Sequence, residues 1–90
     1  MRTLTKFIDD NNRWIALFGK PAMNFPLTQN DVTDILRTLD SNLSPENLHC
    51  DGEISHSEAM RKYRFYAQVA RELEQYCAQN NLTYTEPMEL

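Results

Sequence analysis

The chain has 90 residues, 41% of them hydrophobic and 24% charged, and its formal net charge is −4. This length provides for one domain, and the composition is close to that of average globular proteins, which argues against wholesale disorder. No apolar run approaches the roughly 20 residues that a membrane-spanning helix needs, so we expect no membrane contact. Charges spread through the first 18 residues do not fit a signal peptide. With only two cysteines, we expect a small acidic protein of the cytoplasm with free thiols.

The first predicted helix covers residues 4–18, where apolar side chains recur at intervals of three and four. Asp9 and Arg13 lie four residues apart off the apolar face, at the spacing of a supporting ion pair. Asn11 lies within that face, where its amide would bond to nearby backbone or meet a ligand or partner. Gly19 is expected to cap the helix. The side chains predicted to share the apolar face are Leu4, Phe7, Ile8, Trp14, Ile15 and Phe18.

The second predicted helix covers residues 28–40, after a connector that contains two prolines. Thr28 and Asp31 have the spacing of a capping box, in which each side chain bonds to the other residue's amide. A single short helical turn is predicted at residues 45–48, where Ser44 would be the cap. The apolar residues of the second helix and its hydrophobic staple are Leu27, Val32, Ile35, Leu36 and Leu39.

The longest predicted helix covers residues 55–79 and opens with a second capping box, formed by Ser55 and Glu58. Its apolar stripe consists of Ala59, Tyr63, Tyr66, Ala70, Leu73 and Cys77, widened by Ala67, Val69 and Tyr76. The face expected to meet solvent consists of Arg61, Arg64, Gln68, Arg71, Glu72, Gln75 and Gln79. Asn80 and Asn81 mark its end. For the tail, residues 80–90, the sequence is compatible both with a short extended stretch and with a flexible end.

Three amphipathic helices with one extra helical turn predict a small all-α domain, a helical bundle with a long C-terminal helix. Strand patterns are nearly absent from the sequence. We find no internal repeat that would divide the chain.

The segment Asn47–Glu58 resembles an EF-hand calcium loop, and Asp51–Ser55 is most like the second half of that motif. Counting Asn47 as position one places Gly52 at six and Glu58 at twelve, where such a loop needs a sharp turn and a bidentate carboxylate. The first half departs from the motif, because Asn47 replaces an Asp and His49 offers nitrogen to a hard cation. A turn and a helix cap explain the same residues, so we predict no high-affinity calcium site and leave weak cation binding open.

Four residues have side chains suited to zinc: His49, Cys50, His56 and Cys77. Their spacing fits no paired ligand pattern, so we predict no metal site. The chain has only two glycines, which excludes a Gly-rich phosphate loop. No nucleophile, base and acid stand in a recognisable arrangement. We therefore expect no catalytic residue, no cofactor and no enzyme activity.

Basic and aromatic residues alternate near the start of the long helix, a composition typical of nucleic-acid binding. Only Phe65 lies close enough to the polar face to stack a base beside the arginines. A solvated basic face that pairs with the acidic segment Asp40–Glu58 is the competing interpretation, which the pI of about 5.0 favours. The residues of a nucleic-acid site would be Arg61, Lys62, Arg64, Phe65 and Arg71.

The run Ser44–Glu53 (SPENLHCDGE) resembles a segment of small uncharacterised bacterial and bacteriophage proteins, in which an SPENL–DGE element precedes a charged helix. This resemblance implies a bacterial or phage origin, for which a host-directed inhibitor or adaptor would be natural. It implies no activity, ligand or catalytic residue.

The leading hypothesis is a non-enzymatic module for protein–protein interaction. The stripe of the long helix is broad and rich in Tyr, and two shorter helices are not expected to cover it fully; tyrosines are favoured anchors of such contacts. Its near-heptad spacing would also suit antiparallel pairing with a second copy in a homodimer. The partner is therefore either the chain itself or another protein. The predicted interface residues are Tyr63, Tyr66, Val69, Ala70, Leu73 and Tyr76.

Overall fold

The computed structural model describes residues 2–43 and 56–88. Within these ranges the chain forms three helices and no strand: α1 (Arg2–Ala16), α2 (Gln29–Leu43) and α4 (His56–Gln79). The domain is therefore all-α, as the sequence predicts. The predicted turn at residues 45–48 lies outside the described residues.

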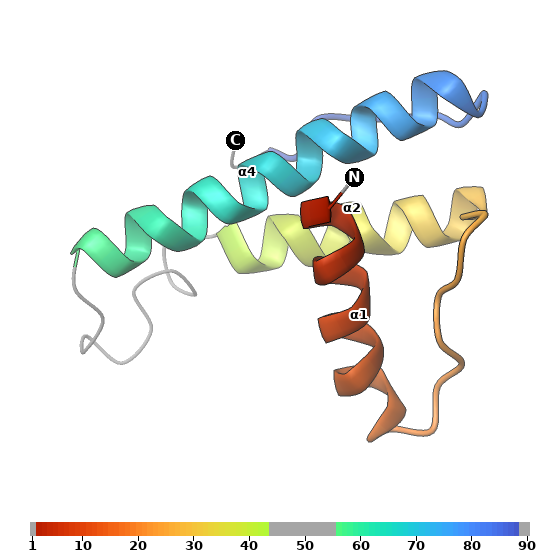
Figure 1. Cartoon of the computed structure of the whole chain (residues 1–90), viewed down its shortest axis with the longest axis horizontal. Coiled ribbons are helices and arrows are strands. Elements are labelled where there is room, and N and C mark those ends of the chain that lie inside the picture. The colour runs from red at the N-terminus through yellow and green to blue at the C-terminus, as the bar shows by residue number, and fades with distance from the viewer. Residues whose placement is uncertain (1, 44–55, 89–90) are drawn as a thin grey trace.

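Helix α4 is the element against which the other two helices pack. At about 1.5 Å per residue its 24 residues extend about 36 Å, close to the longest dimension of the molecule, 39 Å. Figure 1 shows α2 running in the opposite direction to α4 and α1 leaving them at a steep angle. The start of α1 lies near the middle of α4, whereas its far end stands away from the other helices.

The hydrophobic core lies where the three helices meet. The stripe predicted for the long helix is confirmed at six of its positions, because Ala59, Val69, Ala70, Leu73, Tyr76 and Cys77 are all buried. The rest of the core comes from α1, from α2 and from the residue before α2: Leu4, Phe7, Ile8, Leu27, Val32, Ile35, Leu39 and Leu43. Helix α2 continues to Leu43 instead of ending at Asp40 because this fourth buried side chain extends its apolar stripe by one more turn.

The predicted capping box at the start of α2 is present. The Thr28 amide donates to Asp31 Oδ2 at 3.0 Å, and the Asp31 amide donates to Thr28 Oγ1 at 3.1 Å. The predicted staple is present too, since Leu27 and Val32 are both buried. The box thereby provides acceptors for two backbone amides at the start of the helix that have no carbonyl of the same helix as acceptor.

Helices α1 and α4 are each followed by a residue with positive φ. Gly19 has φ 71° and Asn81 has φ 56°. At the first, the Lys20 amide donates to the Ile15 carbonyl at 3.3 Å; at the second, the Leu82 amide donates to the Cys77 carbonyl at 3.0 Å. These six-to-one bonds are those of the Schellman motif, so the stop signals predicted at Gly19 and after Gln79 are confirmed.

Two side-chain amides fasten the non-helical segments to the helices. Asn12 accepts from the Met23 amide and donates to the Met23 carbonyl, both at 2.8 Å. Gln29 accepts from the Thr83 amide at 2.8 Å and donates to the Thr83 carbonyl at 3.0 Å. Each amide replaces the pair of bonds that a neighbouring strand would supply. The connector and the tail through residue 88 are thereby held against the helices.

Candidate functional site

The apolar face of α1 is covered over only half of its length. Leu4, Phe7 and Ile8 are buried against the core. Farther along, Trp14 is 61% exposed and Phe18 63% exposed, although both were expected on the same face. The cause is the angle at which α1 leaves α4, because that angle carries the last turns of the helix beyond the core.

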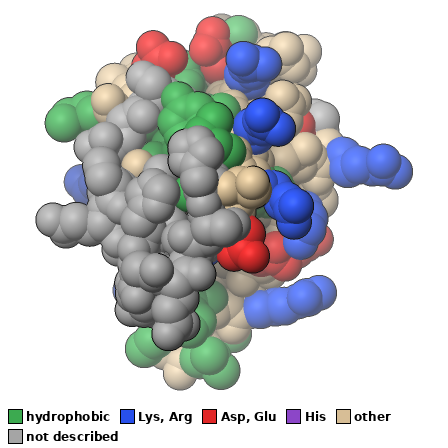
Figure 2. Space-filling view, turned by 90° about the vertical axis from the view of Figure 1, so that its left-hand side faces the viewer, with side chains coloured by type: hydrophobic (Ala, Val, Ile, Leu, Met, Phe, Trp, Pro, Cys, Tyr) green, Lys and Arg blue, Asp and Glu red, His purple; other side chains and the backbone are tan. Residues whose placement is uncertain are grey.

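Three side chains form what we call the α1 tip: Trp14, Leu17 and Phe18. Leu17 is 75% exposed and was not assigned to the apolar face from the sequence. The Trp14 and Phe18 rings meet edge to face, with their centroids 5.5 Å apart. Figure 2 shows hydrophobic side chains at the bottom of the molecule, where α1 ends in Figure 1. A cluster of large apolar side chains this exposed is typical of an interaction surface.

Two adjoining hollows lie between the far half of α1 and α2, with volumes of about 600 and 430 Å³. We call them together the α1–α2 groove. Four residues line both hollows: Asn11, Ile15, Arg37 and Thr38. Of the α1 tip, Trp14 forms part of the first hollow and thereby joins the tip to the groove. Asn11, expected to bond to nearby backbone or to meet a ligand, faces this groove; the backbone bonds of α1 to the connector come from Asn12 instead.

The charges that line the groove are of both signs. Lys20 and Arg37 are accompanied by Asp31 and Asp34 in the second hollow, whereas Arg37 is the one charged residue among the described lining of the first. The tip itself carries no charge. A partner that fits here would therefore bring mainly apolar surface, with little net charge.

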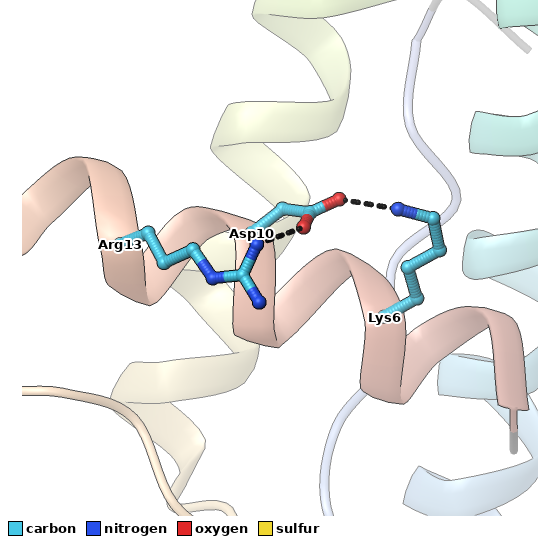
Figure 3. A network of polar contacts seen from close by, with 3 residues as sticks. All are labelled: Lys6, Asp10 and Arg13. Atoms are coloured by element: carbon cyan, nitrogen blue, oxygen red, sulfur yellow. Dashed lines mark hydrogen bonds and ion pairs between the residues drawn. The ribbon is translucent and has the colours of Figure 1, made fainter.

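A short ionic network lies on α1 (Figure 3). Lys6 Nζ is 2.8 Å from Asp10 Oδ2, and Arg13 Nη1 is 3.9 Å from Asp10 Oδ1. The hydrogen bond from Lys6 lowers the pKa of the Asp10 carboxyl. The sequence predicted Asp9 as the partner of Arg13, which is wrong; the ion pair of Arg13 is with Asp10, one residue closer, which also meets Lys6.

The interface residues predicted on α4 lie mainly inside this domain. Val69, Ala70 and Leu73 are at most 1% exposed and Tyr76 is 8% exposed, because α1 and α2 cover them. Tyr63 and Tyr66 are half-buried against the same core, and the Tyr66 ring meets Phe7 edge to face. The four buried side chains offer no surface to a partner in this conformation.

Tyr76 also holds the connector in place. Its hydroxyl accepts from the amide of Leu27 at 2.8 Å in a buried contact, and its ring meets Phe25 at a centroid distance of 5.5 Å. The bond satisfies a backbone donor that burial separates from water. Tyr76 therefore serves the fold.

Glu72 corrects the prediction that this part of α4 faces solvent, because its side chain is buried. Oε1 accepts from the Leu4 amide at 3.0 Å, and Oε2 accepts from Gln68 Nε2 at 3.0 Å. Burial raises the pKa of Glu72, but the hydrogen bonds that it accepts, from Thr3 as well as from Leu4 and Gln68, outweigh this effect and bring the pKa to about 2. Glu72 thus supplies a carboxylate to the first turn of α1, where free amides and the helix dipole favour negative charge.

No protein-family model matches this sequence, and neither a curated protein nor a solved structure matches it. Among the described residues, no helix has the length and apolar character needed to cross a bilayer.

The residues predicted for nucleic-acid binding lie along α4. The four basic ones, Arg61, Lys62, Arg64 and Arg71, are exposed, and Figure 2 shows basic side chains gathered along one edge of the face in view. Phe65 is half-buried, packs against the core and meets the ring of Tyr66 at 5.5 Å. A ring held in this way has little free face on which a base could stack.

Most of the residues considered as metal ligands fall outside the described part. The EF-hand-like stretch lies there up to Ser55, as do His49 and Cys50. Cys77 is buried in the core, and burial raises the pKa of its thiol. Within the described residues, no group of three or more His, Cys, Asp or Glu side chains could hold a metal ion.

Proposed function

We propose that this protein is a non-enzymatic, cytoplasmic module for protein–protein interaction, and that the α1 tip with the α1–α2 groove is its contact surface. One observation carries the proposal: Trp14 lines a groove and contacts Phe18, and both rings and the nearby Leu17 are more than 60% exposed. Aromatic side chains that fill a pocket are the usual anchors of protein interfaces.

The surface differs from the α4 stripe that the sequence favoured. Buried core side chains can meet a partner only if the domain opens, whereas the tip is accessible without any rearrangement. Most pre-organised complexes form with little backbone movement. An adaptor or inhibitor of another protein, in a bacterial or phage setting, is compatible with such a surface.

Site-specific photo-crosslinking tests this proposal in the producing cell. A photoreactive phenylalanine analogue is placed at Leu17, and in a control protein at Met88, which is 89% exposed on the tail. The proposal expects a discrete protein adduct from position 17 that position 88 does not give. The same adducts from both positions, or none from either, would count against a contact through the α1 tip.

A further inference from the structure

A protein contact through the α1 tip raises the question of its partner. Resting on the proposed function, we infer that the partner is a second copy of this chain. In the resulting two-fold dimer, the tip of each protomer occupies the α1–α2 groove of the other. Three properties of the surface lead to this inference: its shape, its area and its charge.

The shape is self-complementary. A two-fold contact uses the same patch on both subunits, so the patch must contain both a projection and a recess that receives it. Here the projection and the recess are adjacent, because Trp14 lines the hollow of about 600 Å³ and also contacts Phe18. Two copies arranged with their α1 helices antiparallel would exchange tips across one axis.

The area favours a reciprocal contact over a one-sided one. Aromatic side chains have about 150–250 Å² to bury, so the exposed fractions of Trp14 and Phe18 leave roughly 250 Å² of apolar surface, to which Leu17 adds. A standard interface buries about 800 Å² on each partner. The tip alone falls short of that area, so a stable contact also needs groove surface, which a reciprocal arrangement uses on both copies.

Charge distinguishes this surface from the other exposed face considered above. Two copies that met through the basic part of α4 would bring Arg61, Lys62, Arg64 and Arg71 against the same residues, which like-charge repulsion opposes. The groove instead offers Lys20 and Arg37 together with Asp31 and Asp34, and it receives a tip without charge. A contact through the tip and the groove therefore brings no excess of one charge together at the interface.

Sedimentation equilibrium over micromolar to submillimolar concentrations tests the inference. The apparent mass should rise from 10.6 kDa toward twice that value. Trp14, the single tryptophan, should shift its fluorescence to shorter wavelength over the same range as its ring leaves water. The variant L17K should weaken dimerisation at least about 30-fold, the effect of losing an interface hot spot. The matched variant M88K changes the charge equally at another exposed residue and should dimerise like the parent.

Circular dichroism first establishes that L17K keeps its helix content, which the 75% exposure of Leu17 favours; if it does not, F18S replaces it. Three results would overturn the inference: a parent protein that stays monomeric at every concentration, equal weakening by L17K and M88K, or a Trp14 shift caused only by phosphatidylcholine–phosphatidylserine vesicles. If the protein is a monomer and position 17 still crosslinks to a different protein in the cell, the inference of a second copy is wrong and the proposed function stands. A monomer without such an adduct would remove both.

Discussion

Replacing Glu72 by glutamine removes a buried negative charge from the start of α1 and preserves the size of the side chain. In the folded protein the pKa of Glu72 is about 2, against an ordinary value of 4.5. The two values differ by about 2.5, which at about 1.36 kcal/mol per pH unit corresponds to about 3 kcal/mol of folding stability. Charge-assisted hydrogen bonds contribute about 1.5–3 kcal/mol each in proteins. We therefore expect E72Q to lower the free energy of unfolding at pH 7 by about 2–3 kcal/mol.

The effect should depend on pH in a definite direction. Because folding lowers the pKa of this carboxyl, its stabilisation is complete above pH 4.5 and is lost as the pH falls toward 2. At neutral pH the parent protein should be more stable than E72Q. The difference should shrink between pH 4.5 and pH 2, where protonation of the parent carboxyl removes the same charge.

Urea unfolding followed by circular dichroism at several pH values measures these differences. The matched control is E74Q, which makes the same chemical change at an exposed position two residues along α4. It should change the unfolding free energy by less than about 0.5 kcal/mol, as is usual for surface substitutions. Equal effects of E72Q and E74Q, or a loss in E72Q that does not vary with pH, would refute the role assigned to this carboxylate.

Three further predictions concern single side chains. Y76F leaves the buried Leu27 amide without its acceptor and should lower the unfolding free energy by about 1–3 kcal/mol. Urea unfolding measures this loss, with Y63F, which alters a half-buried tyrosine, as the control. Equal losses in the two variants would contradict the prediction. G19A places a Cβ at φ 71°, where no atom within 4 Å obstructs it, so backbone strain alone should cost about 1 kcal/mol. N81G relieves the same strain at φ 56° and should not lower the stability of the protein. Thermal unfolding should therefore give G19A the lower melting temperature, and the opposite order or equal values would contradict this prediction. If the basic face of α4 binds nucleic acid, fluorescence anisotropy should detect single-stranded DNA binding at low salt that weakens with added salt and in R64A; no binding at low salt would end that hypothesis.

Local pattern in the sequence was sufficient for the helices and their ends. Apolar residues at intervals of three and four predicted all three helices. The capping pair Thr28 and Asp31 and the stop residues Gly19 and Asn81 act within a few positions of one another, so their roles follow from sequence neighbours alone. The end of α2 was placed too early, since Leu43 joins the stripe only because the core extends to meet it.

The candidate site could not be found in the same way, because it depends on how much of the apolar face of α1 the other helices cover. Periodicity assigned Trp14 and Phe18 to the apolar face of α1, but it does not state how far along that face the other helices reach. Periodicity also placed Glu72 on the polar face of α4. It could not show that Glu72 is buried, because the backbone amide that donates to its carboxylate belongs to a residue 68 positions away in the sequence.

The sequence by itself determined which segments are helical, where two of them begin or end, and which face of each is apolar. Those properties arise from bonds and spacings within one or two helical turns. Tertiary structure decided which apolar side chains are covered and which charge is buried, because both depend on the angle at which α1 crosses α4. That crossing, together with α2, buries Val69, Ala70, Leu73 and Tyr76 of the predicted stripe and leaves the α1 tip open to water.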